Sequence, residues 1–125
     1  MLTKEEIEGN VLIGEYINRF DDYKAYNRSH GLPEYNPYED TVEIESLRYH
    51  SSIDLLLPVI QKILKDHVVV IASQNDTEHH CMIGIGAIRV ISESMAKAVW
   101  LAVVEYLKTL NNNPKTIIQC SLKQK

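Results

Sequence analysis

Residues 49–65, YHSSIDLLLPVIQKILK, carry the clearest helical signal in the chain and decide the fold. Ser51 or Ser52 stands where the N-cap of a helix is expected. The apolar residues that follow recur at a spacing that places them within one sector about 100° wide, which predicts a helix over 52–65 with one buried face. The residues of that face are Ile53, Leu56, Leu57, Ile60, Ile63 and Leu64.

A second helix is predicted at the start of the chain. Thr3 and Glu6 have the spacing of a capping box, and the apolar residues after them recur on one side of a helix over 3–20. The residues on that side are Leu12, Ile13, Tyr16, Ile17 and Phe20. This helix is therefore expected to pack against the helix over 52–65 or the sheet beside it.

Residues 67–110 have a strand pattern first and a helical pattern after it. The β-branched run after His67, a polar turn near Asn75 and a second extended run from Cys81 predict three antiparallel strands between 67 and 91. Ser92 or Ser94 then caps a last helix over 94–110, with its apolar stripe towards the sheet. The chain is thus expected to be α+β: helix, long loop, helix, three antiparallel strands, helix, with the helices packed on a small sheet.

Three segments remain without a clear pattern. Residues 21–40 have neither helical nor strand periodicity and contain four tyrosines, so we predict an irregular, Tyr-rich loop. Val42, Ile44 and Leu47 suggest a short edge strand. The tail, residues 111–125, contains the apolar run TIIQCSL, which adds an edge strand or remains outside the core.

Length and composition limit the possible functions. The 125 residues are expected to form a single domain, and the net charge of −4 argues against binding to nucleic acid or to an anionic membrane surface. No run of residues has the length and apolar character of a membrane span, and the N-terminus lacks the pattern of a signal peptide, so we expect a cytoplasmic protein. The two cysteines, Cys81 and Cys120, are expected to be thiols.

The motif YHSSxDxLxPVxxKI at 49–63 resembles a family of small uncharacterised proteins from phages, prophages and Bacteroidetes-type genomes. The resemblance covers roughly residues 8–20 and 49–110, and the order of elements is similar to that of the phage ABA sandwich domain. Ile53 stands where that family often has Trp. The resemblance implies a single ABA-sandwich-like domain over 1–125 and a mobile-element origin, and it implies no established activity.

Two groups of side chains are candidate sites. Tyr49, His50, Ser51, Ser52 and Asp54, with Tyr35 and Tyr38 from the preceding loop, are candidates for ligand binding, because free amides at a helix start and a titratable histidine suit a polar ligand. The alternative is that Ser52 and Asp54 only cap the helix. His79, His80 and Cys81 are weak metal candidates, because His80 points away from the other two in a strand. We expect no metal and no cofactor.

The favoured function is that of a phage or prophage accessory protein that binds a host protein or a small ligand without catalysing a reaction. A homodimer is compatible with this function. The first alternative is a small enzyme or nucleotide-handling protein that uses His50, Asp54 or the His79–His80 turn. The second is a module resembling a double-stranded-RNA-binding domain, although Glu93 stands near the position where that family has lysines that contact phosphate.

Overall fold

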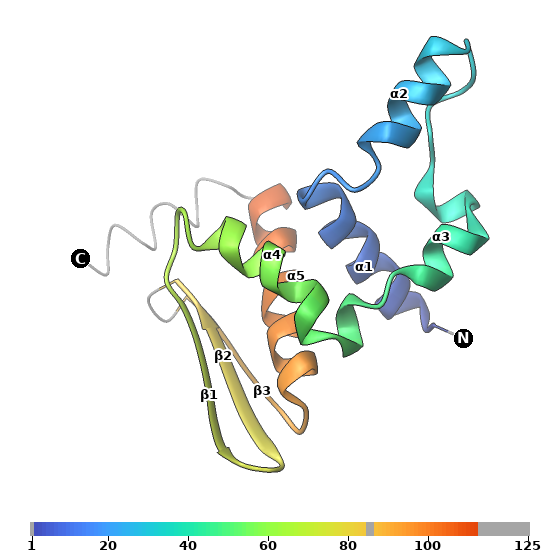
Figure 1. Ribbon diagram of the computed structural model, residues 1–125. Coiled ribbons are helices and arrows are strands. Elements are labelled where there is room, and N and C mark those ends of the chain that lie inside the picture. Colours follow the sequence, from blue (N-terminus) through green and yellow to red (C-terminus); the bar gives the residue numbers. More distant parts are fainter. Residues whose placement is uncertain (1, 85–86, 113–125) are drawn as a thin grey trace.

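The computed structural model describes residues 2–84 and 87–112, which form an α+β domain as predicted. Figure 1 shows α4 and α5 beside one face of a small sheet, while α2 extends away from the body. In chain order the elements are α1 (Lys4–Tyr16), α2 (Asp21–Ser29), the 3-10 helix η1 (Pro37–Glu39), α3 (Thr41–Ser46), the 3-10 helix η2 (Tyr49–Ser51), α4 (Ile53–Ile63), β1 (Val69–Asn75), β2 (Glu78–Ile83), β3 (Ile88–Ser92) and α5 (Met95–Asn112).

The first helix is shorter than the predicted 3–20 because it ends in a Schellman motif. Asn18 has a φ of 62°, and the amide of Arg19 donates to the carbonyl of Gly14 at 2.8 Å. Asparagine tolerates this left-handed conformation better than most residues with a side chain. Phe20 continues the apolar stripe from the turn that follows and is fully buried.

The prediction of an irregular loop over 21–40 is wrong, because α2 and η1 lie within it. Asp21 and Asp22 in the first turn of α2 and Arg28 in its last turn favour a helix through its dipole. None of the residues of α2 is buried, so the helix has no apolar stripe from which periodicity would reveal it.

The predicted edge strand around Val42 is also wrong, because these residues form the short helix α3. The Asp40 side chain caps this helix by accepting from the amide of Glu43 at 3.0 Å. Ile44 is buried, and Leu47 is buried just after the helix, whereas 82% of the Val42 side chain is exposed. The apolar residues Val42, Ile44 and Leu47 therefore belong to a single helical turn and the residue after it, and not to an alternating strand.

The sheet has the strand order β1-β2-β3, with both pairs antiparallel, as predicted. The helix α5 packs against β2 and β3, and it buries Cys81, Ile83 and Ile88 between them. Since β2 lies in the centre, β1 is an edge strand on the side away from β3.

The helix α4 is capped by Ser52 as predicted, but its buried face is shifted around the helix from the predicted stripe, because it includes Val59. The residues buried on it are Leu56, Val59, Ile60 and Ile63. Leu57 and Leu64 were predicted to be buried and are 46% and 51% exposed. The physical reason is that α4 packs on α5 and not across the sheet, so that one neighbouring helix covers only part of the stripe.

The long helix α5 runs through the centre of the core. Its buried residues include Ala98, Val99, Trp100, Ala102, Val103, Tyr106 and Leu107. The helix continues through residues 111 and 112, which were assigned to the tail, and the predicted edge strand in the tail lies outside the described residues.

Candidate functional site

The seven predicted ligand-binding residues do not form one site. His50 and Ser51 line a hollow of about 350 Å³ between the N-terminal ends of α1 and α5. Ser52 lies outside it, because its Oγ accepts from the amide of Leu55 at 3.3 Å and so caps α4, and Asp54 is exposed on the first turn of that helix. For Ser52 the capping interpretation is confirmed, and Asp54 lies in the first helical turn, where a negative charge is favoured.

The three tyrosines of the prediction also lie outside the hollow. Tyr49 is buried in the core, and this burial raises its pKa. Tyr38 is half-exposed on η1. Tyr35 stacks on Tyr23 with 4.8 Å between the ring centroids. Tyr35 and Tyr38 therefore do not line the hollow that His50 lines.

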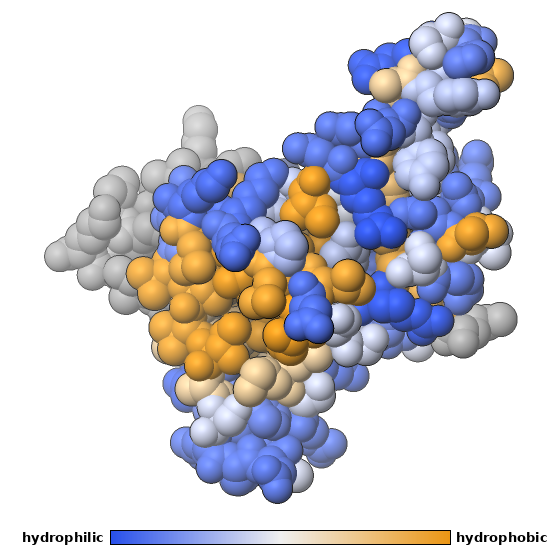
Figure 2. All heavy atoms as spheres, in the orientation of Figure 1, coloured by the Kyte–Doolittle hydropathy of each residue, from blue (hydrophilic) through white to orange (hydrophobic). Residues whose placement is uncertain are grey.

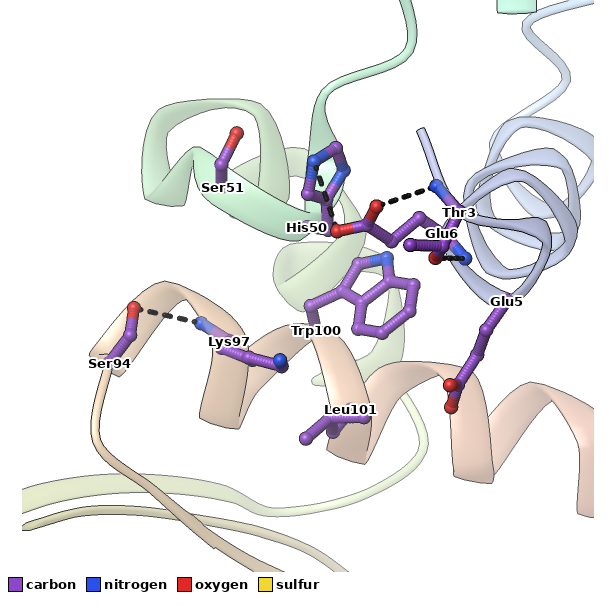
Figure 3. Close-up of a pocket in the computed structure, with 9 residues that line it drawn as sticks. All are labelled: Thr3, Glu5, Glu6, His50, Ser51, Ser94, Lys97, Trp100 and Leu101. Carbon is purple, nitrogen blue, oxygen red and sulfur yellow. Dashed lines mark hydrogen bonds and ion pairs between the residues drawn. The ribbon is translucent and has the colours of Figure 1, made fainter. Parts of the chain in front are cut away.

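Figure 3 shows the side chains that surround the hollow, with the Trp100 ring in their middle. They come from the first turn of α1, from η2 and from the first turns of α5. The lining residues are Thr3, Glu5, Glu6, His50, Ser51, Ser94, Lys97, Trp100 and Leu101. Acidic, basic and hydroxyl groups thus stand around one aromatic ring.

Behind the hollow, Asn10 links three parts of the chain, and sequence reasoning missed it. Its side chain is fully buried. The Oδ1 atom accepts from Nε1 of Trp100 at 2.8 Å, while Nδ2 donates to the carbonyl of Leu47 at 2.8 Å and lies 2.9 Å from Nδ1 of His50. The available signal was a lone asparagine in register with the apolar stripe of α1, one helical turn before Ile13.

These contacts determine the tautomer of His50. An indole nitrogen only donates, so the Asn10 oxygen must face Trp100 and the amide nitrogen must face His50. Nδ1 of His50 is therefore the acceptor, and the proton of the neutral ring is on Nε2. Nε2 lies 3.6 Å from Oε2 of Glu6, which is longer than a hydrogen bond. His50 has no free lone pair with which to take a proton from a nucleophile.

The carboxylate of Glu6 is itself held in place. Its Oε1 accepts from the amide of Thr3 at 2.9 Å, in the predicted capping box. This hydrogen bond lowers the pKa of Glu6, and the charges of His50 and Lys97 lower it further. Among the described residues Lys97 has no ion-pair partner within 4 Å, so its ammonium group is available at the rim of the hollow.

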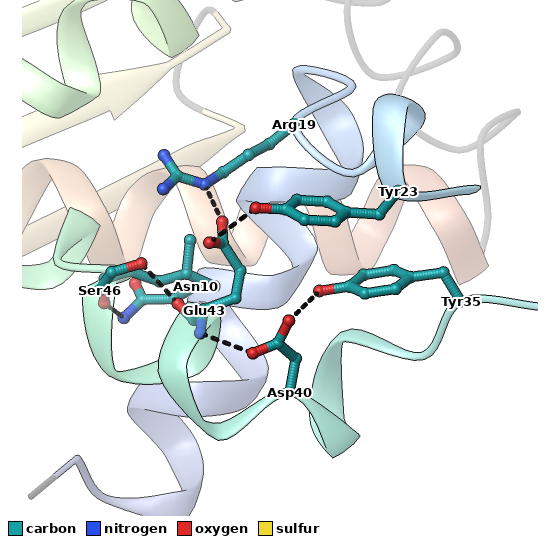
Figure 4. A network of polar contacts seen from close by, with 8 residues as sticks. Asn10, Arg19, Tyr23, Tyr35, Asp40, Glu43 and Ser46 are labelled. Atoms are coloured by element: carbon teal, nitrogen blue, oxygen red, sulfur yellow. Dashed lines mark hydrogen bonds and ion pairs between the residues drawn. The ribbon is translucent and has the colours of Figure 1, made fainter. Parts of the chain in front are cut away.

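A second polar network anchors α2 to the body (Figure 4). The carboxylate of Glu43 accepts from Nε of Arg19 at 2.6 Å and from the hydroxyl of Tyr23 at 3.4 Å. Beside it, the hydroxyl of Tyr35 donates to Asp40 at 3.3 Å, and burial, with the nearby Asp40 charge, raises the Tyr35 pKa to about 12. These tyrosines therefore serve as donors that attach the projecting helix.

The candidate metal ligands His79, His80 and Cys81 have other contacts. Nδ1 of His79 lies 2.6 Å from Oγ of Ser73, and Nε2 of His80 lies 3.1 Å from the Glu78 carboxylate. Cys81 is fully buried, and burial raises its pKa to about 11. Within residues 2–84 and 87–112, the histidine, cysteine and acidic side chains form no group of three placed to hold a metal ion.

An exposed apolar surface lies away from the hollow. Figure 2 shows apolar residues gathered over α4 and the adjoining part of β1. Three exposed apolar side chains in and next to these two segments form what we call the apolar face: Leu57, Leu64 and Ile71. Each is between 37% and 51% exposed. A contiguous exposed apolar patch is typical of a surface that binds another protein.

The apolar face adjoins a free strand edge. The amide of Gly84 donates to the carbonyl of Val68 at 2.9 Å, and the register then directs the backbone groups of Val70 and Ala72 towards β2. The amides and carbonyls of Val69, Ile71 and Ser73 therefore point to the opposite side, where the described part of the chain places no strand.

Exposed strand edges are normally protected by charged residues or proline, and β1, VVIASQN, has neither. Its edge is therefore competent to pair with a further strand.

Comparison of the sequence with protein-family models and curated proteins, and of the fold with solved structures, finds no match. The resemblance to phage proteins therefore stays a prediction. None of the helices in the described part of the chain combines the length and the apolar character needed to cross a membrane.

Proposed function

We propose that this chain is a non-enzymatic binding protein, and that its partner presents an extended segment of alternating apolar residues to the edge of β1. The observation that carries the proposal is the edge of β1, which has no charged side chain and no strand paired to it among the described residues, next to the exposed apolar residues over α4 (Figure 2). A phage or prophage accessory role, as the sequence resemblance suggests, is compatible with such a partner.

The chemistry of the other candidate residues supports binding over catalysis. His50 uses Nδ1 as an acceptor for Asn10 and directs Nε2 towards Glu6. The thiol of Cys81 is buried with a raised pKa, which opposes the thiolate that a nucleophile requires. Neither the His50 imidazole nor the Cys81 thiol is therefore arranged to act as a base or a nucleophile in the alternative function, a small enzyme.

The strand edge of β1 and the exposed leucines beside α4 would contribute differently to the binding of an added strand. Backbone pairing along Val69, Ile71 and Ser73 would provide affinity that depends little on the partner's sequence. Side chains alternate between the two faces of a strand, so that every second residue of the partner would lie beside Leu57 and Leu64. Specificity would then depend on apolar residues at alternate positions.

Selection of random nine-residue peptides displayed on phage against the immobilised full-length protein tests the proposal. The expected result is enrichment of peptides with apolar residues at alternate positions. The affinity of the selected peptides is then measured by fluorescence anisotropy against Ile71→Pro, which removes one outward amide, and Leu64→Asp. Each variant is expected to weaken binding by about tenfold or more.

Two control variants separate the edge from other surfaces. Ile71→Thr keeps the outward amide and the β-branched shape, and is expected to bind better than Ile71→Pro. Val42→Asp changes an equally apolar side chain on α3 and is expected to leave affinity unchanged. Selected peptides without alternation, or binding that survives Ile71→Pro, would show that the β1 edge is not the docking surface.

The hollow at Trp100 supports a second candidate function, the binding of a small carboxylate. The supporting observation is the ammonium of Lys97 at the rim, which has no ion-pair partner within the described residues, next to the apolar surfaces of Trp100 and Leu101. The indole N–H of the single tryptophan gives one NMR signal, which should shift when acetate or benzoate is added and should not shift in Lys97→Gln. An unperturbed signal in the unmodified protein would exclude this site.

A further inference from the structure

We propose that the strand that pairs with the edge of β1 belongs to a second copy of this chain, and that the two β1 strands meet antiparallel across a twofold axis at Val70. The two three-stranded sheets then form one continuous sheet. This inference rests on the proposed function, because it names the partner of the same edge.

The backbone of β1 restricts how two copies can pair. The amides and carbonyls of Val69 and Ile71 point away from β2, towards the edge. In an antiparallel ladder such outward residues face each other in pairs that exchange two hydrogen bonds. With the axis at Val70, Val69 faces Ile71 of the second copy and Ile71 faces its Val69, so the outward groups of both residues have partners.

This register also matches apolar residues with apolar residues. The run VVVIA that begins at Val68 pairs with itself, so that Val68 lies beside Ala72 of the second copy and Val70 lies beside its own counterpart. The two neighbouring registers that keep the outward groups paired match less well. One of them places Gln74 beside Val68, and the other places Asp66 beside Ala72.

Apolar side chains are exposed on both faces of this edge. Ile71 shares a face with the buried residue Cys81, on the side of α5, and is 37% exposed. Val68 and Val70 lie on the opposite face and are 54% and 41% exposed. A partner strand with apolar residues on one face only would cover one of these two groups. A second β1 is apolar on both faces and covers both.

The absence of charge on β1 is a particular requirement of a twofold contact. Residues close to the axis lie beside the same residues of the other copy, so a charged side chain there would face its own charge. The strand Val69–Asn75 contains no ionisable side chain. Figure 2 shows that the apolar surface continues from β1 over α4, where Leu57 and Leu64 are exposed, so that α4 of each copy extends the contact beyond the strands.

Analytical ultracentrifugation of the full-length protein over a range of concentrations tests the inference. The expected result is a mass of twice 14.3 kDa that falls towards that of a single chain on dilution. Val70→Lys brings two like charges together at the axis and is expected to raise the dimer dissociation constant about tenfold or more.

The matched control is Ile91→Lys. Ile91 is 55% exposed and lies on the same face of the sheet as Val70, but on β3, away from the β1 edge. The same added charge at this position is expected to leave the dissociation constant of the dimer unchanged.

Disulfide trapping tests the register itself. In a Cys120→Ser background, Val70→Cys is expected to give a covalent dimer on mild oxidation, because the two Cα atoms of a non-hydrogen-bonded antiparallel pair lie about 4.5 Å apart, within the range of a disulfide. The remaining thiol, Cys81, is buried and does not interfere. Ile91→Cys in the same background is the control and is expected to give little covalent dimer.

A single-chain mass at every concentration would overturn the inference. So would a dimer that tolerates Val70→Lys as well as it tolerates Ile91→Lys, because the contact would then lie on another surface. Failure to trap Val70→Cys in a dimeric sample would overturn the register with its axis at Val70.

Peptide binding separates this inference from the proposed function. If the chain is monomeric and the selected peptides bind in a manner that depends on Ile71, only the second copy is wrong. If the dimer forms through Val70 and no peptide binds even at dilutions where the monomer predominates, the edge serves self-association and the external partner of the proposed function is wrong. If neither a dimer nor peptide binding is found, both are wrong.

Discussion

Replacement of Asn10 by alanine tests the interpretation that one buried amide joins α1, the segment before η2 and α5. The substitution leaves the indole N–H of Trp100 and the carbonyl of Leu47 without partners. A buried polar group without a partner costs about 1–3 kcal/mol, so the loss is about 4 kcal/mol for the two groups together. The free energy of unfolding of a typical domain is about 5–15 kcal/mol, so this loss is a large fraction of the total stability.

The assay is urea unfolding followed by circular dichroism, since the indole itself belongs to the network. Asn10→Leu is expected to be similarly destabilised although it fills the space, because it restores none of the hydrogen bonds. Combining Asn10→Ala with Trp100→Phe should cost less than the sum of the two single changes, because the phenyl ring leaves no N–H unpaired. Asn111→Ala, at an exposed position of α5, is the control.

A free energy of unfolding for Asn10→Ala within about 0.5 kcal/mol of the unmodified protein would refute the reasoning, since that is the range of ordinary surface substitutions. Additivity of Asn10→Ala and Trp100→Phe would separately contradict the direct hydrogen bond between their side chains.

Three further outcomes are expected. Gly9→Ala should destabilise the protein by about 1–3 kcal/mol in urea unfolding, because its Cβ would collide with the Trp100 ring. In a Cys120→Ser background the thiol of Cys81 should resist Ellman's reagent at pH 8 until the protein unfolds; stability should then fall as the pH rises from 9 towards 11, because the unfolded thiol ionises first. Glu43→Gln should speed hydrogen exchange in α2 with little change in melting temperature, because it loosens only the anchor of an exposed helix.

The sequence was sufficient to predict the elements that have both a cap and a buried face. The helix after Ser52, the capping box at Thr3 and the three-stranded sheet all combine a local signal with apolar periodicity. Where either the cap or the buried apolar face was absent, the predicted secondary structure was wrong. The exposed helix α2 has charges suited to its dipole and no buried stripe, and the single turn of α3 is too short to distinguish helix from strand.

The candidate site was harder to predict, because it depends on contacts between distant residues. His50 stands out in the sequence as a residue that no cap requires, but its partners lie 40 residues away at Asn10 and further along the chain at Trp100. Nothing local in the sequence indicates that an asparagine on an apolar stripe is paired with an indole rather than facing solvent. Side-chain pairing of this kind follows from the packing of α1 on α5.

The difference between the predicted and the observed buried face of α4 bears on the proposed function. Its apolar stripe includes Leu57 and Leu64, and a stripe of that width is what a helix buried on two sides requires. The described fold covers only the part that meets α5, and leaves the rest beside the unpaired edge of β1. Such a helix, next to a strand edge to which the described residues pair no strand, is the surface that we propose a partner strand covers. The same two leucines that contradict the predicted packing are therefore the residues that the proposed partner strand would cover.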